Sequence, residues 1–408
     1  MKKTIISALV LLASLSAGAM NFDKTLRLNY IFSGTDKTAE IALAELCSID
    51  GWAGRRVNMD RVALKGNGQL CMKDAATGAI LYRNSFSTLF QEWQNSEEAV
   101  SSRQSFENVF LVPMPEGKAE ITVELYDNRG AVIATLTHPV DPSDILIRPT
   151  GRSVTPHKYL HRSGDSSEKI DIAIVAEGYS AEESELFYED AEKAMNDLWS
   201  HEPFSSLKDR FNIVAVAAVS AESGISVPHE GKWLDTALGS HFDTFYSDRY
   251  LTTLNLFRLH DVLAGIPYEH IIILANTDTY GGGGIFNSYV LSSAHNKFSS
   301  PVIVHEFGHS FAGLADEYFY DDQYTEFYYP DTEPWEPNIT TLADFSCKWQ
   351  DMIGRDGVDL YEGAGYQSKG VFRSSKDCRM QTNLHPSFCP VCERAIRDII
   401  SFYTEQRD

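Results

Sequence analysis

The chain has 408 residues, of which 43% are apolar and 23% charged, so it can form two or three domains with sizeable cores. Its formal net charge of −22 argues against nucleic acid as a partner, because that binding needs a basic surface. After the N-terminal leader, no stretch reaches the roughly 18 apolar residues of a membrane-spanning helix, so we expect no membrane span.

The N-terminus has the order of a secretory signal peptide. Two lysines, Lys2 and Lys3, precede an apolar run from Ile5 to Leu15, and small residues follow up to Ala19. We therefore predict a signal peptide over residues 1–19, cut after about Ala19. The mature protein would be exported to the periplasm, the cell surface or the medium.

Residues 20–150 are expected to form strands. Apolar and polar residues alternate over 25–32, 121–126 and 132–137, and the last two runs flank a turn signal at 127–130. This pattern predicts an antiparallel β-sandwich of immunoglobulin-like character. Its expected role is accessory, as a folding partner, a spacer or a substrate-docking domain.

The pattern changes after a predicted linker at 151–168. Within 169–408, apolar strands are expected at 170–176, 211–217 and 270–275, with helices at 181–199 and 248–263. This rhythm predicts a twisted, mostly parallel sheet backed by helices, and so an α+β protein. Glycines 281–284 are expected to lead into a strand at 285–291, which either binds an extended peptide or is buried in the sheet.

One short motif carries the chemistry, and it reads His305-Glu306-x-x-His309. On a helix, residues four apart lie on one face, so His305 and His309 can hold the same metal ion. Glu306, one position further on, can reach a water at that ion and act as a general base.

The residues around the motif predict where the helix begins and ends. Ser300 can cap the helix and Pro301 suits its first position, while Gly313 can adopt the left-handed conformation that ends it. The chain would then return towards the imidazoles and offer Asp316 or Glu317 as the third ligand. A core helix with two satisfied histidines is the alternative interpretation of the motif.

This stretch resembles a known family, and the matching pattern is His305-Glu306-x-x-His309-x-x-x-Gly313-x-x-Asp316-Glu317-Tyr318. It is similar to the IgA-peptidase family of bacterial zinc metallopeptidases, a metzincin-like group. A β-rich domain ahead of the peptidase domain, and Met380 within a segment that looks like a Met-turn, extend the resemblance.

The resemblance implies an endopeptidase with one catalytic Zn²⁺ and a protein or peptide substrate, for which the family name suggests immunoglobulin A. It assigns His305, His309 and Asp316 as metal ligands with Glu317 as the substitute for Asp316, Glu306 as general base, and Met380 as the turn methionine. The commoner metzincin spacing would put the third ligand at Ala315, one residue earlier.

Two other functions remain open. The chain could be an exported zinc-containing binding or adhesion module without catalysis, which a fourth protein ligand would favour. It could also be a zinc hydrolase of a non-protein substrate, although such sites usually collect their ligands from separate loops.

Six cysteines in an exported chain suggest structural disulfides. Cys47 and Cys71 are expected to pair, which leaves three connectivities for Cys347, Cys378, Cys389 and Cys392. The spacing of Cys389 and Cys392 also occurs in redox pairs and in half of a zinc knuckle, but no thioredoxin-like context surrounds it, and export disfavours free thiolates.

Overall fold

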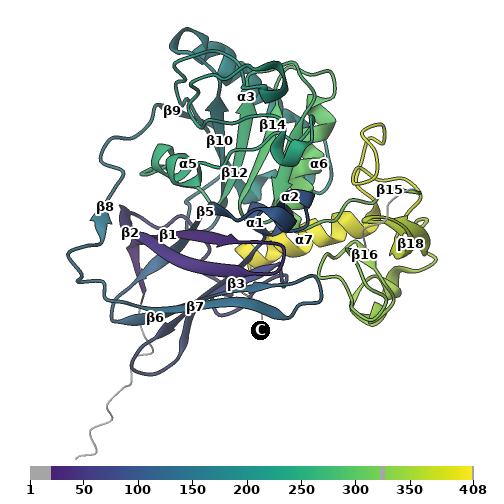
Figure 1. The fold of residues 1–408 in the computed structure, drawn as a ribbon, viewed down its shortest axis with the longest axis horizontal. Coiled ribbons are helices and arrows are strands. Elements are labelled where there is room, and N and C mark those ends of the chain that lie inside the picture. Colours follow the sequence, from purple (N-terminus) through teal and green to yellow (C-terminus); the bar gives the residue numbers. More distant parts are fainter. Residues whose placement is uncertain (1–19, 322–326, 407–408) are drawn as a thin grey trace, which may run out of the picture.

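The computed structural model describes residues 20–321 and 327–406, and it begins with two four-stranded sheets (Figure 1). The predicted signal peptide at 1–19 lies outside the described residues. The strand orders are β5-β1-β2-β8 and β4-β3-β6-β7. The strands are β1 (Met20–Gly34), β2 (Ala39–Asp50), β3 (Gly68–Asp74), β4 (Ile80–Phe86), β5 (Gln104–Pro115), β6 (Ala119–Tyr126), β7 (Val132–Val140) and β8 (Arg148–Pro149).

The alternating pattern explains how the two sheets pack. Leu26, Leu28 and Tyr30 of β1 are fully buried and share one core with Ile121 and Val123 of β6. The predicted hairpin is confirmed, because β6 and β7 pair antiparallel across the turn at 127–130. Two short helices, α1 (Leu89–Trp93) and α2 (Glu97–Ser101), precede β5.

The rest of the chain is built on a six-stranded mixed sheet with the order β13-β14-β12-β10-β11-β9. The four central strands are parallel, and both edge strands run antiparallel to their neighbours. The strands are β9 (His157–Arg162), β10 (Ile170–Glu177), β11 (Phe211–Val216), β12 (His270–Ala275), β13 (Gly282–Ile285) and β14 (Tyr289–Ser293). The predicted strands at 170–176, 211–217 and 270–275 are confirmed.

Successive side chains of the central strands point to opposite faces of this sheet, and different elements pack against each face. Ile272 and Leu274 of β12 pack with the long helices, whereas Ile271 and Ile273 join the same core as Leu28 of the N-terminal sheets. The helices are α3 (Ser184–Trp199), α4 (Phe204–Leu207), α5 (Leu256–Val262), α6 (Ser299–Ala312) and α7 (Pro390–Thr404). Helix α7 lies on the same face as α3 and α6, because its Ile396 and Ile400 share a core with Ile272. None of the described helices is long and apolar enough to cross a membrane.

A fourth sheet, the small C-terminal sheet, lies beyond α6 and contains β15 (Phe319–Tyr320), β16 (Ile339–Thr340), β17 (Tyr361–Ala364) and β18 (Tyr366–Arg373). The sequence pattern did not predict it. Its strands are short, and β15 pairs with β18 across more than 40 residues of chain. That pairing brings Tyr366 beside the segment that follows α6.

Three predicted elements differ from the structure. The linker at 151–168 contains β9, which forms one edge of the six-stranded sheet. The helix at 248–263 is reduced to α5, because residues before it form bridges, such as His241 with Thr252. The single strand at 285–291 is a hairpin of β13 and β14, since Asn287 turns the chain with a φ of 52°.

The expected disulfides are also wrong. All six cysteines lie in the described part of the chain, and each is a free thiol there. Cys47 on β2 and Cys71 on β3 belong to different sheets, so neighbouring strands do not bring them together. Cys347 is exposed, whereas Cys378, Cys389 and Cys392 are buried in one cluster.

Gly284 allows the edge strand β13 to lie directly against the backbone of α6. A Cβ built at Gly284 would lie 2.3 Å from the backbone oxygen of Glu306, and backbone cannot move aside as a side chain can. We expect Gly284→Ala to lower the free energy of unfolding by about 1–3 kcal/mol, the cost of overpacking.

The measurement is urea unfolding followed by circular dichroism. Gly117→Ala is the matched control, because a Cβ there meets nothing within 4 Å, and it should change stability by less than about 0.5 kcal/mol. Equal losses in both variants would show that the approach of β13 to α6 is not the constraint.

Candidate metal centre

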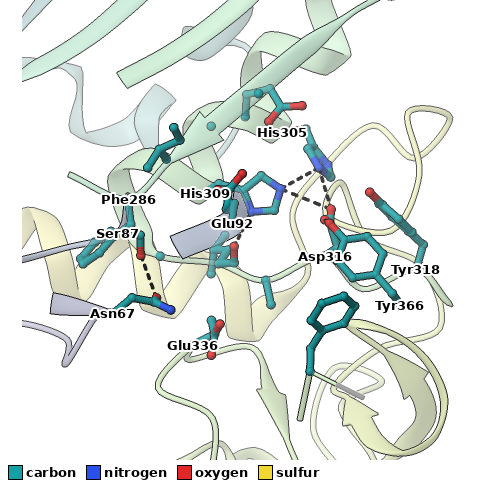
Figure 2. A pocket seen from close by; sticks show the side chains of 18 of the residues that line it. Asn67, Ser87, Glu92, Phe286, His305, His309, Asp316, Tyr318, Glu336 and Tyr366 are labelled. Atoms are coloured by element: carbon teal, nitrogen blue, oxygen red, sulfur yellow. Dashed lines mark hydrogen bonds and ion pairs between the residues drawn. The ribbon is translucent and has the colours of Figure 1, made fainter. Parts of the chain in front are cut away.

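Helix α6 carries both histidines of the motif, which Figure 2 shows, and also Glu306 between them. It begins at Ser299 with Phe298 as its N-cap, two residues before the predicted start at Pro301. Nε2 of His305 and Nε2 of His309 lie 3.0 Å apart. The possible ligand atoms of these histidines and of Glu306 all lie within 4.8 Å of one another, so the three side chains could meet at one metal ion.

The end of α6 returns the chain to the histidines. Gly313 has a φ of 58°, the left-handed conformation predicted for it, and its N–H bonds to the carbonyl of His309. Three residues later, Oδ1 of Asp316 lies 3.0 Å from Nε2 of His305 and 3.3 Å from Nε2 of His309. Figure 2 shows these three side chains converging.

The outer nitrogens of the two imidazoles define their tautomers. Nδ1 of His305 lies 3.0 Å from the carbonyl oxygen of Arg379, and Nδ1 of His309 lies 2.5 Å from that of Leu314. A carbonyl oxygen only accepts, so each Nδ1 carries the proton. Each Nε2 is then the atom that faces the candidate metal position, and a divalent metal would bind there in place of a proton.

Tyr366 holds the carboxylate of Asp316 through the oxygen that does not face the imidazoles. The sequence analysis did not identify Tyr366. Its hydroxyl donates to Oδ2 of Asp316 at 2.5 Å, which leaves Oδ1 directed at the imidazoles. The rings of Tyr318 and Tyr320 contact the ring of Tyr366, with centroids 5.3 and 6.5 Å away. Tyr366 lies 50 residues after Asp316, so no local spacing could have indicated it.

Glu317 faces a different part of the molecule. Its Oε1 accepts from Nδ2 of Asn338 at 3.0 Å and from Sγ of Cys392 at 3.1 Å. The structure therefore brings Asp316 to the two imidazoles, and directs Glu317 towards the buried cysteines.

Met380 lies directly beneath the helix turn that carries the two histidines. It is fully buried, and a Cβ built at Gly308 would lie 2.8 Å from its sulfur. The carbonyl of Met380 accepts from the N–H of Glu317 at 2.9 Å. Because the preceding carbonyl, that of Arg379, orients His305, this segment supports both sides of the candidate centre.

Burial and mutual attraction shift the pKa values at the centre. Burial opposes ionisation of Asp316, but attraction to His309 and His305 outweighs it and holds the pKa of Asp316 well below its usual range. Burial alone would lower the pKa of His309, whereas Asp316 reverses the shift and raises it to about 9. Burial raises the pKa of Glu306, which the neighbouring imidazoles only partly oppose.

The candidate centre lines a cavity of about 1250 Å³ that the N-terminal sheets help to build. Its walls include β13, the small C-terminal sheet, and residues 65–67, 87–88, 91–92, 95–96 and 127–130. Glu92 of α1 reaches this cavity near His309 (Figure 2) and accepts a hydrogen bond from the hydroxyl of Tyr250. Burial raises the pKa of Glu92 to about 7. Sequence reasoning missed Glu92, because it stands alone on a helix of five residues.

Comparison with known proteins gives two matches to protein-family models. Residues 159–360 and 355–400 match the model described as IgA Peptidase M64, and residues 19–137 match the model described as Peptidase M64 N-terminus. A search of curated protein sequences found no match.

The hydroxyl of Tyr366 gives a direct test of the candidate centre. We expect Tyr366→Phe to weaken zinc binding by about 10–100-fold, the usual effect of losing a partner that orients a metal ligand. Affinity can be measured by competition with a chromophoric chelator. Tyr320→Phe removes a hydroxyl from the same aromatic cluster but leaves the bond from Tyr366 to Asp316, and should bind as the parent does. Unchanged affinity in Tyr366→Phe would contradict Asp316 as a ligand.

Proposed function

The chain belongs to the IgA peptidase M64 family, with its N-terminal domain, and is therefore a metallopeptidase; from this we propose that it is an exported zinc endopeptidase that cuts peptide bonds within proteins. The observation that carries the proposal is the convergence of Nε2 of His305, Nε2 of His309 and Oδ1 of Asp316 within 3.3 Å, beside the carboxyl group of Glu306. Immunoglobulin A is a candidate substrate, on the strength of the family's description alone.

Zinc fits this set of donors. Two imidazole nitrogens and one carboxylate oxygen make three protein ligands, and the cavity in front of them offers an open position, as catalytic zinc sites require. A zinc ion bound there would supply Lewis acidity, which lowers the pKa of water and polarises the carbonyl group of the substrate. Asp316 is the proposed third ligand, and Glu317 is the weaker candidate because its Oε1 is engaged by Asn338 and Cys392.

Glu306 is the proposed general base. Its carboxylate takes a proton from the attacking water and later delivers that proton to the leaving amine nitrogen. The raised pKa of Glu306 suits this role, because a carboxyl group with a pKa nearer neutrality holds the proton between the two steps. Met380, the proposed turn methionine, and the carbonyl of Arg379 keep His305 in place during the reaction.

The volume of the cavity and the edge strand that lines it favour an extended polypeptide as substrate. Residues 282–285 of β13 line it, and β13 is an edge strand, so a peptide could pair with the part of this edge that the bridge from Tyr250 to Gly282 leaves open. Loops and α1 of the N-terminal part supply another wall, which would suit the substrate-docking role predicted for that part. We further propose that the N-terminal sheets form an immunoglobulin-like sandwich and that the second part is metzincin-like. The leader at 1–19 supports the proposed export.

Glu306→Gln tests the catalytic assignment. We expect the variant to fold and to bind zinc as the parent does, with kcat lower by about 10²–10⁴-fold, because only the proton acceptor is lost. Cleavage is measured by mass spectrometry on a peptide library, on casein and on immunoglobulin A. The parent should lose its activity with a chelator and regain it with zinc.

Glu192→Gln is the control, because Glu192 is exposed on α3. Normal turnover by Glu306→Gln would refute its role as general base. A parent protein that binds zinc yet cuts none of the substrates would favour the non-catalytic binding module instead.

A further inference from the structure

A second cluster of potential metal ligands lies behind the candidate centre. It consists of Glu317, Cys378, Cys389 and Cys392, whose ligand atoms all lie within 4.8 Å of one another. None of the four residues is more than 3% exposed. Three sulfurs and one carboxylate thus share a small volume that solvent does not reach.

The distances within this cluster suit one tetrahedral ion. Sγ of Cys378 and Sγ of Cys392 lie 3.8 Å apart, and Oε1 of Glu317 lies 3.1 Å from Sγ of Cys392 and 4.0 Å from Sγ of Cys389. Two thiolates bound to zinc at ~2.3 Å in tetrahedral geometry lie ~3.8 Å from each other. A disulfide would need ~2.05 Å, and one disulfide among three cysteines would leave the third without a partner.

Hydrogen-bond donors and a helix N-terminus lie beside the sulfurs. Sγ of Cys378 accepts hydrogen bonds from the backbone N–H groups of Met380 and Cys389, at 3.5 and 3.2 Å. Cys389 and Cys392 lie at the N-terminus of α7, a helix of 15 residues, where the helix dipole favours thiolates. Sγ of Cys389 also contacts the hydroxyl of Ser374 at 3.3 Å.

One buried oxygen of Glu317 indicates that a cation binds in this cluster. Oε2 of Glu317 is buried and has no hydrogen-bond partner, although its sister Oε1 has two. A buried carboxylate oxygen left without a partner is costly. A cation among the sulfurs would relieve that cost, whereas a disulfide would not.

We propose that Cys378, Cys389, Cys392 and Glu317 bind a second zinc ion, which is structural and distinct from the catalytic one. The site is closed, because four protein ligands fill a tetrahedral sphere and all four are buried. Thiolates select zinc over the hard cations magnesium and calcium.

The proposed ion would join three segments that build the catalytic centre. Glu317 follows Asp316, and Cys378 comes two residues before Met380, whose carbonyl accepts from the N–H of Glu317. Cys389 and Cys392 anchor both segments to α7. The second ion would therefore fix the distance between the Asp316 segment and the turn that orients His305, without touching the substrate.

Metal content separates the two sites. We expect about two zinc ions per chain in the mature parent and about one in the double variant His305→Ala/His309→Ala, measured by mass spectrometry of the metal. X-ray absorption on that double variant should show sulfur ligands at ~2.3 Å, and its cobalt form should show a thiolate-to-metal charge-transfer band. These readouts use intact cysteines, so they do not depend on whether cysteine variants fold.

Thiol counting gives an independent result. With a chelator and denaturant but no reductant, all six cysteines should react if the cluster binds metal. Cys392→Ser should lose one zinc ion, whereas Cys347→Ser, at an exposed cysteine, should lose none. Zinc-free protein from the double histidine variant, or four reactive thiols in the parent, would overturn this proposal. Full peptidase activity with a single zinc ion would overturn it and leave the proposed catalytic function intact.

Discussion

The candidate centre depends on holding three potential metal-ligand atoms close together. Nε2 of His305, Nε2 of His309 and Oδ1 of Asp316 lie within 3.3 Å of one another. Each is fixed from behind by a bond that the rest of the fold supplies: the carbonyl groups of Arg379 and Leu314 for the histidines, and the hydroxyl of Tyr366 for the aspartate. Hydrogen-bond partners of this kind orient the ligands of a metal site in the absence of the ion. Here they come from the end of α6, the Met380 turn and the small C-terminal sheet. Three separate segments of the second half of the chain therefore help to position these three atoms.

The N-terminal sheets take part in this arrangement as well. They share a continuous core with one face of the six-stranded sheet, and Nδ2 of Asn58 bonds to the carbonyl groups of Phe402 and Glu405 at the end of α7. Arg129, at the tip of the β6–β7 hairpin, lies over the ring of Tyr329, 3.9 Å from its centroid. These contacts place the N-terminal part at the cavity, where it would restrict which polypeptides reach the proposed catalytic centre. Selectivity in this protein is thus expected to reside in contacts between its two parts, and not in one pocket beside the metal.

Local rules predicted the parts of the site that are local in sequence. Helical spacing placed His305, Glu306 and His309 on one helix, and the left-handed preference of glycine placed the turn at Gly313 correctly. Strand alternation also identified the hairpin and three central strands. Tyr366 was missed because it reaches the site through the pairing of β15 with β18, which no periodic pattern reports. The disulfide prediction used compartment and cysteine number, and neither reports that three of the thiols converge on a buried carboxylate.

The adjacent acids Asp316 and Glu317 show how one short segment can serve two sites. Neighbouring side chains of a non-helical chain diverge, and here one carboxylate faces two imidazoles while the next faces three sulfurs. Exchanging their roles would need a one-residue shift of the segment. The N–H of Glu317 is bonded to the carbonyl of Met380, and the amide group of Asn338 is bonded to both backbone groups of Ala315, so these contacts oppose that shift. These backbone contacts on either side of Asp316 therefore favour Asp316 over Glu317 as the proposed ligand, a choice that spacing alone left open.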